Sequence, residues 1–200
     1  MHLLIMGPPG AGKGTQASRI GNHYSVPAIS TGDMFRAMRG QDTPLAKQVQ
    51  QIMASGEYVP DEVTNQVVAS RLAEADCAPG FLLDGYPRTL QQVEYLDATL
   101  DEGGRQLDAV ISLQADSDEV VRRLLKRGET SGRDDDNEAT IRARQDKYTV
   151  ETAPLLDVYR ERGLLVEIDG LGAVDDVTQR LFAALDARTG SSTALVGGAS

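Results

Sequence analysis

Short apolar runs alternate with amphipathic stretches along most of this chain. Turn-forming residues bound the apolar runs, which is typical of buried strands. The runs predict strands at residues 3–6, 26–30, 80–84, 109–113 and 164–168. Because helical patterns separate them, we expect an α/β fold with a five-stranded, mainly parallel sheet and helices on both faces. A ligand crevice is expected at the carboxyl ends of the strands.

The segments between these runs place apolar residues three and four positions apart, as on one face of a helix. They predict helices at 15–23, 34–39, 89–100, 117–127, 137–162 and 174–187, and two more that begin at Pro44 and Asp61. Pro154 is expected to kink or divide the 137–162 helix, because proline lacks a backbone N–H. Residues 128–132 are expected to form a loop before an acidic turn at 134–136.

The length of 200 residues allows one main core, and we expect a single domain over residues 1–187. Residues 188–200 are small, polar and glycine-rich, so they are predicted to be a disordered tail. The formal net charge of −10 disfavours binding to nucleic acid or to an anionic membrane. Any site for an anion must therefore be locally basic.

The cysteine content and the hydropathy of the chain indicate in which cellular compartment it works and which metal sites it can form. Cys77 is the only cysteine, which excludes an internal disulfide and a multi-cysteine zinc site. No apolar run reaches the length of a membrane span, and the first residues lack the pattern of a secretory signal. We therefore expect a cytoplasmic protein. A monomer is expected because no coiled-coil seam or long apolar surface run is present.

The segment Gly7–Thr15 directly follows the first predicted strand and has the composition of a phosphate-binding loop. Its glycines expose backbone N–H groups that can surround phosphate oxygens, Lys13 supplies a positive charge, and a helix begins where the anion would lie. The common motif has Ser or Thr directly after the lysine, whereas here Gly14 intervenes and Thr15 carries the hydroxyl. The segment predicts a site for nucleotide phosphates.

Asp84 ends a predicted strand, where a carboxylate can orient Mg²⁺ directly or through its waters, or can simply cap the next turn. On the 117–127 helix, Arg123 and Arg127 are predicted at the border of the inner face, and Arg122 and Lys126 point away. That inner face is predicted to contain Val120, Val121, Leu124 and Leu125. An exposed ion pair, such as Glu119 with Arg123, is the structural alternative for each arginine.

Arginine density suggests that two phosphate-bearing groups meet in one site. Guanidinium groups offset the repulsion between them and support charge on a transferring phosphoryl group. The arginines in question are Arg36, Arg88, Arg123, Arg127, Arg133 and Arg144. If the acceptor is a nucleoside monophosphate, its oxygen is already ionised at neutral pH and no general base is required. We therefore expect no catalytic role for His2 and His23.

Four segments together resemble the adenylate kinases of the short-lid type, within the nucleoside monophosphate kinases. They are Gly7–Thr15, Ser30–Arg36, Asp84–Arg88 and Arg123–Arg133, and the resemblance covers residues 1 to about 187. The displaced Thr15 is the form of the loop that this family uses. The resemblance implies a P-loop kinase with a small helical AMP-binding lobe at 30–59, a short lid at 128–138 and a cis Tyr86–Pro87 bond. No structural zinc is expected, because the lid has no cluster of ligands.

The resemblance also implies the activity and the residues that perform it. The implied reaction is reversible phosphoryl transfer from MgATP to AMP, giving two ADP. The implied ATP-binding residues are Gly10, Ala11, Gly12, Lys13, Gly14, Thr15, Arg123, Arg127, Arg133 and Gly172. The implied AMP-binding residues are Thr31, Phe35, Arg36, Met53, Val59, Gly85, Arg88, Gln92, Arg133 and Arg144. The implied catalytic residues are Lys13, Asp84, Arg88, Arg123, Arg127, Arg133 and Arg144, with Asp84 orienting Mg²⁺ through water and Asp135 and Asp136 serving lid closure.

Three other functions are compatible with part of this pattern. A uridylate/cytidylate kinase is the main alternative, although Ala in place of Thr31 and Asn in place of Gln92 would be expected there. A kinase for a small alcohol would need a base for a neutral hydroxyl, and the arginine set argues against it. A GTPase-type switch would need an Asn-Lys-x-Asp segment, and no lysine here follows an asparagine.

Overall fold

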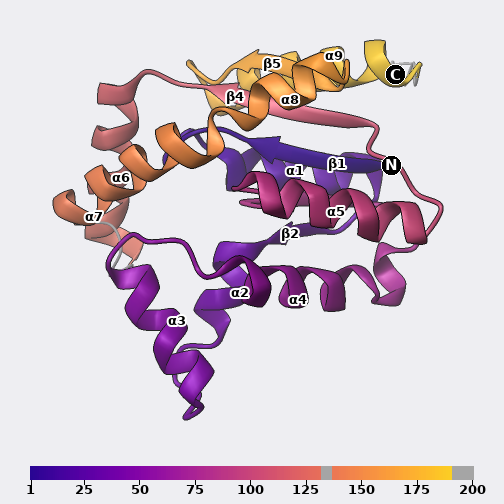
Figure 1. Cartoon of the computed structure of the whole chain (residues 1–200). Helices are drawn as coiled ribbons and strands as arrows, with labels where there is room; N and C mark the ends of the chain where they lie inside the picture. Colours follow the sequence, from indigo (N-terminus) through magenta and orange to yellow (C-terminus); the bar gives the residue numbers. More distant parts are fainter. Residues whose placement is uncertain (132–136, 191–200) are drawn as a thin grey trace, which may run out of the picture.

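The computed structural model describes residues 1–131 and 137–190 and contains one five-stranded sheet (Figure 1). The strands are β1 (His2–Met6), β2 (Ala28–Ser30), β3 (Phe81–Asp84), β4 (Ala109–Gln114) and β5 (Leu165–Asp169). Their order in the sheet is β2-β3-β1-β4-β5, and every neighbouring pair is parallel. The predicted α/β fold with a parallel sheet is confirmed.

Helices connect the strands, as the apolar spacing predicts. They are α1 (Lys13–Tyr24), α2 (Thr31–Ala37), α3 (Pro44–Ala54), α4 (Asp61–Leu72), α5 (Leu90–Glu102), α6 (Ser117–Ser131), α7 (Glu138–Lys147), α8 (Leu155–Glu161) and α9 (Val174–Thr189). A 3-10 turn, η1 (Ala75–Cys77), precedes β3. The predicted 137–162 helix is divided, as expected for Pro154: α7 passes into a π-helical turn, η2 (Tyr148–Thr152), and α8 begins after the proline.

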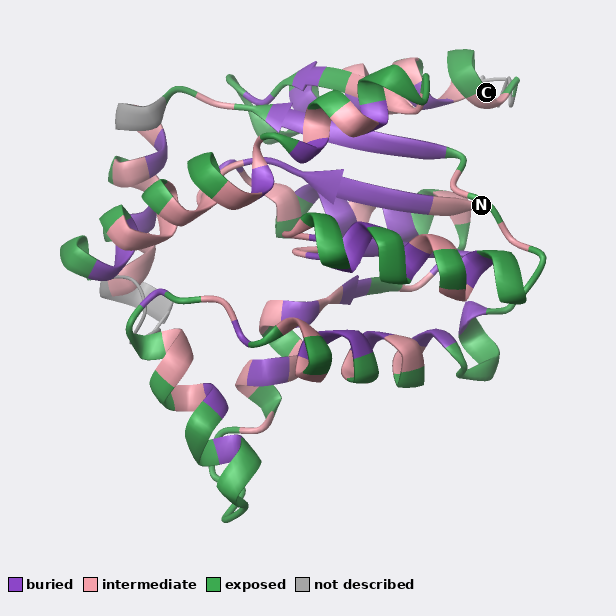
Figure 2. Ribbon diagram, viewed as in Figure 1, coloured by how far each residue is buried: buried purple, intermediate pink, exposed green. Residues whose placement is uncertain are grey.

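Helices cover both faces of the sheet, and each face has its own apolar core (Figure 2). Leu4 and Met6 of β1 face the core formed with α4, α5 and α8, whereas Leu3 and Ile5 face α1 and α9. This alternation follows from the two-residue period of a strand. Since both faces are buried, the central strands are mostly apolar, as is typical of parallel sheets, and Ser112 is the buried polar residue within them.

The segment between β2 and α4 forms a small helical lobe with a core of its own. Phe35, Val49 and Val59 are buried together there, apart from the two cores of the sheet. The Ser30 side chain caps α2 and the Thr43 side chain caps α3, each by accepting the backbone N–H of the third residue of its helix. Figure 1 shows α3 projecting away from the sheet, so that the lobe forms one side of the molecule.

Three local predictions on α6 and α9 are wrong. Helix α6 continues through Ser131, so residues 128–131 are helical rather than a loop, and Gly128 does not interrupt the helix. Leu125 is 38% exposed, because only the stripe that contains Val120 and Leu124 packs inward. Helix α9 continues to Thr189, so the tail does not begin at residue 188. The predicted acidic turn at 134–136 and residues 191–200 lie outside the described residues.

The end of α9 is attached to the sheet domain by one arginine. The Arg188 guanidinium donates to the backbone oxygens of Asp108 (2.8 Å) and Gly163 (2.7 Å). Both acceptors lie in loops that lead into strands β4 and β5. These bonds hold the last turn of α9 against the sheet. The composition of residues 188–200 could not predict this attachment, because the contacts join segments far apart in the chain.

Candidate active site

The loop between β1 and α1 has the backbone that anion binding requires. Gly10 and Gly12 have φ values of +89° and +91°, and Gly12 is the N-cap residue of α1. A Cβ on Gly10 would lie 2.8 Å from Cγ1 of Val120, so the loop can approach α6 only because this residue is glycine. The helix N-terminus, with its unpaired N–H groups, is thereby directed into the space beyond the sheet.

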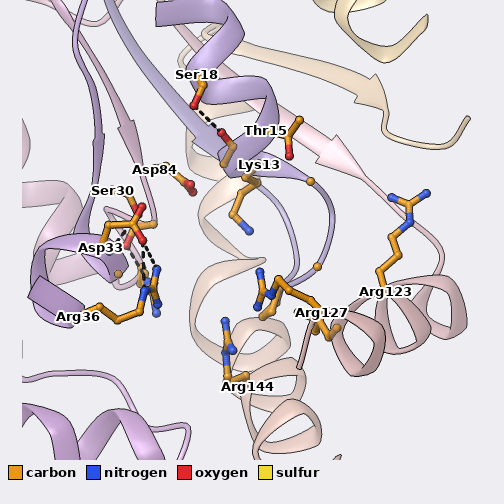
Figure 3. Close-up of a pocket in the computed structure, with 18 residues that line it drawn as sticks. Lys13, Thr15, Ser18, Ser30, Asp33, Arg36, Asp84, Arg123, Arg127 and Arg144 are labelled. Atoms are coloured by element: carbon orange, nitrogen blue, oxygen red, sulfur yellow. Dashed lines mark hydrogen bonds and ion pairs between the residues drawn. The ribbon is translucent and has the colours of Figure 1, made fainter. Parts of the chain in front are cut away.

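A cavity of about 590 Å³ opens in front of this loop (Figure 3). It lies at the carboxyl ends of the strands, where β1 is flanked by β3 and β4 and the chain crosses from one side of the sheet to the other. The residues that line it are Pro9, Gly10, Gly12, Lys13, Gly14, Thr15, Ser18, Ser30, Gly32, Asp33, Arg36, Asp84, Gly85, Arg88, Arg123, Leu124, Arg127 and Arg144. Five separate segments of the chain thus meet in one site.

Lys13 lies at the start of α1 with its ammonium group folded over the loop. Its Nζ donates to the backbone oxygens of Gly7 (2.7 Å) and Pro8 (2.9 Å). The pKa of Lys13 is lowered to about 8, chiefly by burial; the Asp84 carboxylate opposes this shift, and the positive charges of Arg88 and Arg144 contribute to it. The Lys13 ammonium is therefore poorly solvated and lies near other cations, and a bound polyanion would stabilise its charged form.

Asp84 ends β3 on the other side of the loop. One of its carboxylate oxygens faces Gly14, at 3.7 Å from the position that a Cβ on this glycine would take. Burial raises the pKa of Asp84, and the positive charges of Lys13 and Arg88 partly offset this increase. Thr15 lines the same cavity, so a carboxylate and a hydroxyl border the space next to the phosphate loop.

Arginines approach the cavity from three sides. Figure 3 shows Lys13, Arg127 and Arg144 pointing into one space and Arg36 approaching it from α2. Helix α7, which carries Arg144, is attached to the phosphate loop because the Gln145 side chain donates to the backbone oxygen of Pro9 (2.9 Å). This bond places the guanidinium of Arg144 opposite the lysine.

Helix α6 carries two basic residues that face the cavity and two that face away from it, as predicted. Arg123 and Arg127 line the cavity, whereas Arg122 and Lys126 are exposed. Arg123 also forms the ion pair that was the structural alternative, with 2.8 Å between its Nε and Oε1 of Glu119. The two interpretations are compatible here, because the ion pair holds the side chain at the rim of the cavity.

A second hollow of about 40 Å³ lies between the small lobe and the sheet. Its lining includes the predicted residues Thr31, Phe35, Met53, Val59, Gly85, Arg88 and Gln92, together with Gly32, Glu57, Tyr58 and Thr64. Thr31 donates to the backbone oxygen of Gly85 (2.9 Å). The Gln92 amide donates to Asp61 (2.6 Å) and accepts from the Arg88 backbone N–H (2.8 Å), so its orientation is set by the protein.

Some predicted site residues are not brought together. Ala11 is buried, and neither Ala11 nor Gly172 is among the described residues that line the two hollows. Arg133, Asp135 and Asp136 lie outside the described residues. His2 and His23 are far from the cavity lining: the imidazole of His2 contacts the Gln106 backbone oxygen (2.9 Å), and His23 stacks on Phe182 with 4.1 Å between ring centroids.

Sequence reasoning missed several residues of the site. Ser30 and Asp33 line the large cavity. Both belong to the Ser30–Arg36 motif, so their position in it could have identified them as site residues. Tyr58 and Thr64 line the smaller hollow but follow no motif. The cis Tyr86–Pro87 bond is present as predicted.

Comparison with known proteins identifies the family. The sequence model of the family described as adenylate kinase matches residues 5–164. The chain belongs to the adenylate kinase family. Similar proteins named adenylate kinase occur in Leifsonia xyli subsp. xyli, with 60% identity over 186 residues (93% of this chain and 94% of the relative), and in Clavibacter michiganensis subsp. michiganensis, with 59% identity over 187 residues (94% of each). A third, from a Nocardioides species, is 56% identical over 186 residues (93% of this chain and 97% of the relative).

Membership in the adenylate kinase family confirms the predicted resemblance, the P-loop kinase fold and the prediction of a phosphotransferase. None of the described helices is long and apolar enough to cross a membrane. Within residues 1–131 and 137–190, no three His, Cys, Asp or Glu side chains are grouped so that they could hold a metal ion. The roles of individual residues in binding and catalysis stay predictions.

Proposed function

We propose that this chain catalyses reversible phosphoryl transfer from MgATP to AMP, giving two ADP. The observation that carries the proposal is that Lys13 of the phosphate loop and Arg36 and Arg88 of a separate wall line one cavity. This arrangement can hold two phosphate groups facing each other, which a hydrolase or a nucleotide switch does not need. Adenine nucleotide balance is the corresponding cellular role.

On the donor side, we assign the ATP phosphates to the phosphate loop from Gly10 to Thr15. Backbone N–H groups and the Lys13 ammonium would bind the phosphate oxygens. Arg123 and Arg127 from α6 and Arg144 from α7 line the same cavity and would stabilise negative charge on the transferring group. We also assign Ala11, Arg133 and Gly172 to ATP binding, and this assignment rests on the resemblance alone.

On the acceptor side, Arg36 and Arg88 would bind the AMP phosphate, and adenine would lie against the residues that line the smaller hollow. Phe35, Met53 and Val59 provide apolar contact for a base. The Gln92 amide keeps one further N–H and one further lone pair after its bonds to Asp61 and Arg88, so it can still pair with an adenine edge. Thr31 and Gly85 complete this part of the site, and Arg144 lines the large cavity beside it.

The residues present also fit a magnesium ion carried by ATP. Asp84 and the hydroxyl of Thr15 are hard oxygen donors on the wall of a cavity wide enough for the waters that Mg²⁺ retains. When bound, the ion neutralises charge on the β- and γ-phosphates. Asp84 would orient it through water, and no zinc is proposed.

No described side chain in the cavity has to act as a general base in this reaction. The second phosphate pKa of a nucleoside monophosphate is about 6, so the attacking oxygen is already ionised at neutral pH. The protein therefore has to bring two anions together, and the surrounding arginines perform that task. This explains why neither histidine of the chain is needed in the site.

The experiment that tests the proposal measures phosphorylation of AMP, CMP, UMP, GMP and dTMP by MgATP, together with ATP hydrolysis without an acceptor. We expect AMP to be by far the best acceptor and hydrolysis to be slow. Preference for CMP or UMP would support the uridylate/cytidylate alternative, which the relatives above do not support. Hydrolysis that does not depend on an acceptor would refute the kinase assignment.

We further propose a cytoplasmic monomer with the AMP-binding lobe at 30–59 and the short lid at 128–138. A single chain supplies both walls of the cavity, so catalysis requires no second subunit. ATP and AMP/ADP are the proposed partners, and the net charge of −10 argues against nucleic acid and membrane partners. Sedimentation at micromolar concentration tests the monomer, and a stable dimer would refute it.

A further inference from the structure

Tyr58 lies where the small lobe returns to the sheet domain, and it contacts Arg88 in two ways. Its ring lies beneath the Arg88 guanidinium, with 4.8 Å from Cζ to the ring centroid. Its hydroxyl hydrogen-bonds to Thr152, whose own hydroxyl donates to the Arg88 backbone oxygen. We propose that Tyr58, together with Thr152, is a positioning residue that holds Arg88 ready for the acceptor phosphate. This inference rests on the proposed function.

The ring contact sets the direction of the guanidinium. Arg88 Nε donates to the Gly85 backbone oxygen (2.7 Å), which fixes one edge of the group. In the part of the chain that the structure describes, Arg88 forms no ion pair with a carboxylate. The face of the Tyr58 ring therefore adds to the stabilisation that the Asp84 charge gives Arg88, while leaving the outer N–H groups available to an anion.

The hydroxyl contact fixes the backbone. Thr152 is 5% exposed in the π-helical turn η2, and its Oγ1 donates to the Arg88 oxygen at 2.9 Å. Since this uses the threonine proton, the Tyr58 hydroxyl must donate to Thr152 Oγ1, at 2.9 Å. The Arg88 N–H is bonded to Gln92 (2.8 Å), so both backbone polar groups of Arg88 are held.

A purely structural role for Tyr58 makes a different prediction. Lys147 also lies over the Tyr58 ring, at 5.8 Å from the centroid, and forms an ion pair with Glu57 at 2.9 Å. These contacts join the small lobe to α7. If Tyr58 only attached the lobe to α7, loss of the Lys147 contacts would have the same kinetic effect as loss of the ring.

The test compares steady-state kinetics of Tyr58→Leu, Tyr58→Phe and Lys147→Met with those of the wild-type enzyme, after wild-type turnover of AMP has been established. We expect Tyr58→Leu to lower kcat/KM for AMP by about 3- to 10-fold, the strength of a partly buried cation–π contact, with KM for ATP unchanged. Tyr58→Phe retains the ring and should recover most of this loss. Lys147→Met should behave as the wild type.

A double-mutant cycle with Arg88→Ala decides whether the effect passes through Arg88. We expect Tyr58→Leu to have no further effect on kcat/KM for AMP once Arg88 is alanine. An equal loss in that background, an equal rise in KM for ATP, or a Lys147→Met variant that matches Tyr58→Leu would overturn the proposal.

Circular dichroism shows whether the Tyr58→Leu variant folds. If it does not fold, Thr152→Val provides a second, independent test. It removes the hydroxyl that bonds to Arg88 but retains the shape of the side chain. We expect a loss of kcat/KM for AMP that vanishes in the Arg88→Ala background, and a loss that persists there would refute the role. If the wild-type enzyme fails to phosphorylate AMP at all, the proposed function has failed, and that outcome is distinct from a failure of this inference.

Discussion

Replacement of Lys13 by methionine should make the free protein more stable at neutral pH, although it removes a proposed catalytic group. Burial lowers the pKa of Lys13 from 10.5 to about 8. One pKa unit corresponds to about 1.4 kcal/mol, so keeping this ammonium charged in the folded protein costs about 3 kcal/mol below pH 8. Loss of the bonds to Gly7 and Pro8 offsets about 1 kcal/mol each. We expect a net gain of about 1 kcal/mol at pH 7.

The pH dependence of this difference is the sharper result. Between pH 8 and 10.5 the unfolded wild-type chain binds a proton at Lys13 that the folded chain has released, so wild-type stability rises with pH. Methionine cannot titrate. The advantage of Lys13→Met should therefore be largest below pH 8 and fall by about 2 to 3 kcal/mol as the pH rises from 7 to 10.

Urea unfolding of the wild type and of Lys13→Met at several pH values between 7 and 10 measures this difference. The buried tyrosines titrate in both proteins, so their contribution cancels. Lys126→Met is the matched control, because Lys126 is exposed on α6, and its difference from the wild type should not change with pH. A Lys13→Met difference that is flat across this range would refute the reasoning that the ammonium is desolvated.

Three further substitutions test the site and the core. Arg88→Ala should reduce kcat/KM for AMP by about 100-fold or more, the cost of losing a charge-assisted contact to the acceptor phosphate. Exposed Arg122→Ala should have no effect, and near-normal turnover of Arg88→Ala would contradict the acceptor assignment. Leu124→Ala should lower the free energy of unfolding by about 3 kcal/mol, against less than about 0.5 kcal/mol for the exposed Leu125→Ala, and equal losses in urea unfolding would contradict the assigned helix face. Gly10→Ala should destabilise the protein by about 1 to 3 kcal/mol, since a Cβ there strains the positive φ and meets α6, and an unchanged urea midpoint would count against it.

Much of the fold follows from local patterns. The five apolar runs became the five strands, and Pro154 divided the helix in which it lies. The two errors on α6 have different causes, one local and one tertiary. Helix α6 continues past Gly128, because a single glycine does not break a helix that is otherwise favourable. Leu125 is exposed because the loop at Gly10 covers only one stripe of α6.

The sequence by itself determined the parallel sheet, the phosphate loop at Gly7–Thr15 and the family, because strand period, glycine backbone freedom and motif spacing are properties of short segments. Only the tertiary structure decided which arginines share a cavity, that the pKa of Lys13 is lowered, and that Tyr58 contacts Arg88. The physical reason is that desolvation and side-chain proximity depend on how distant segments pack, and no local pattern specifies that packing.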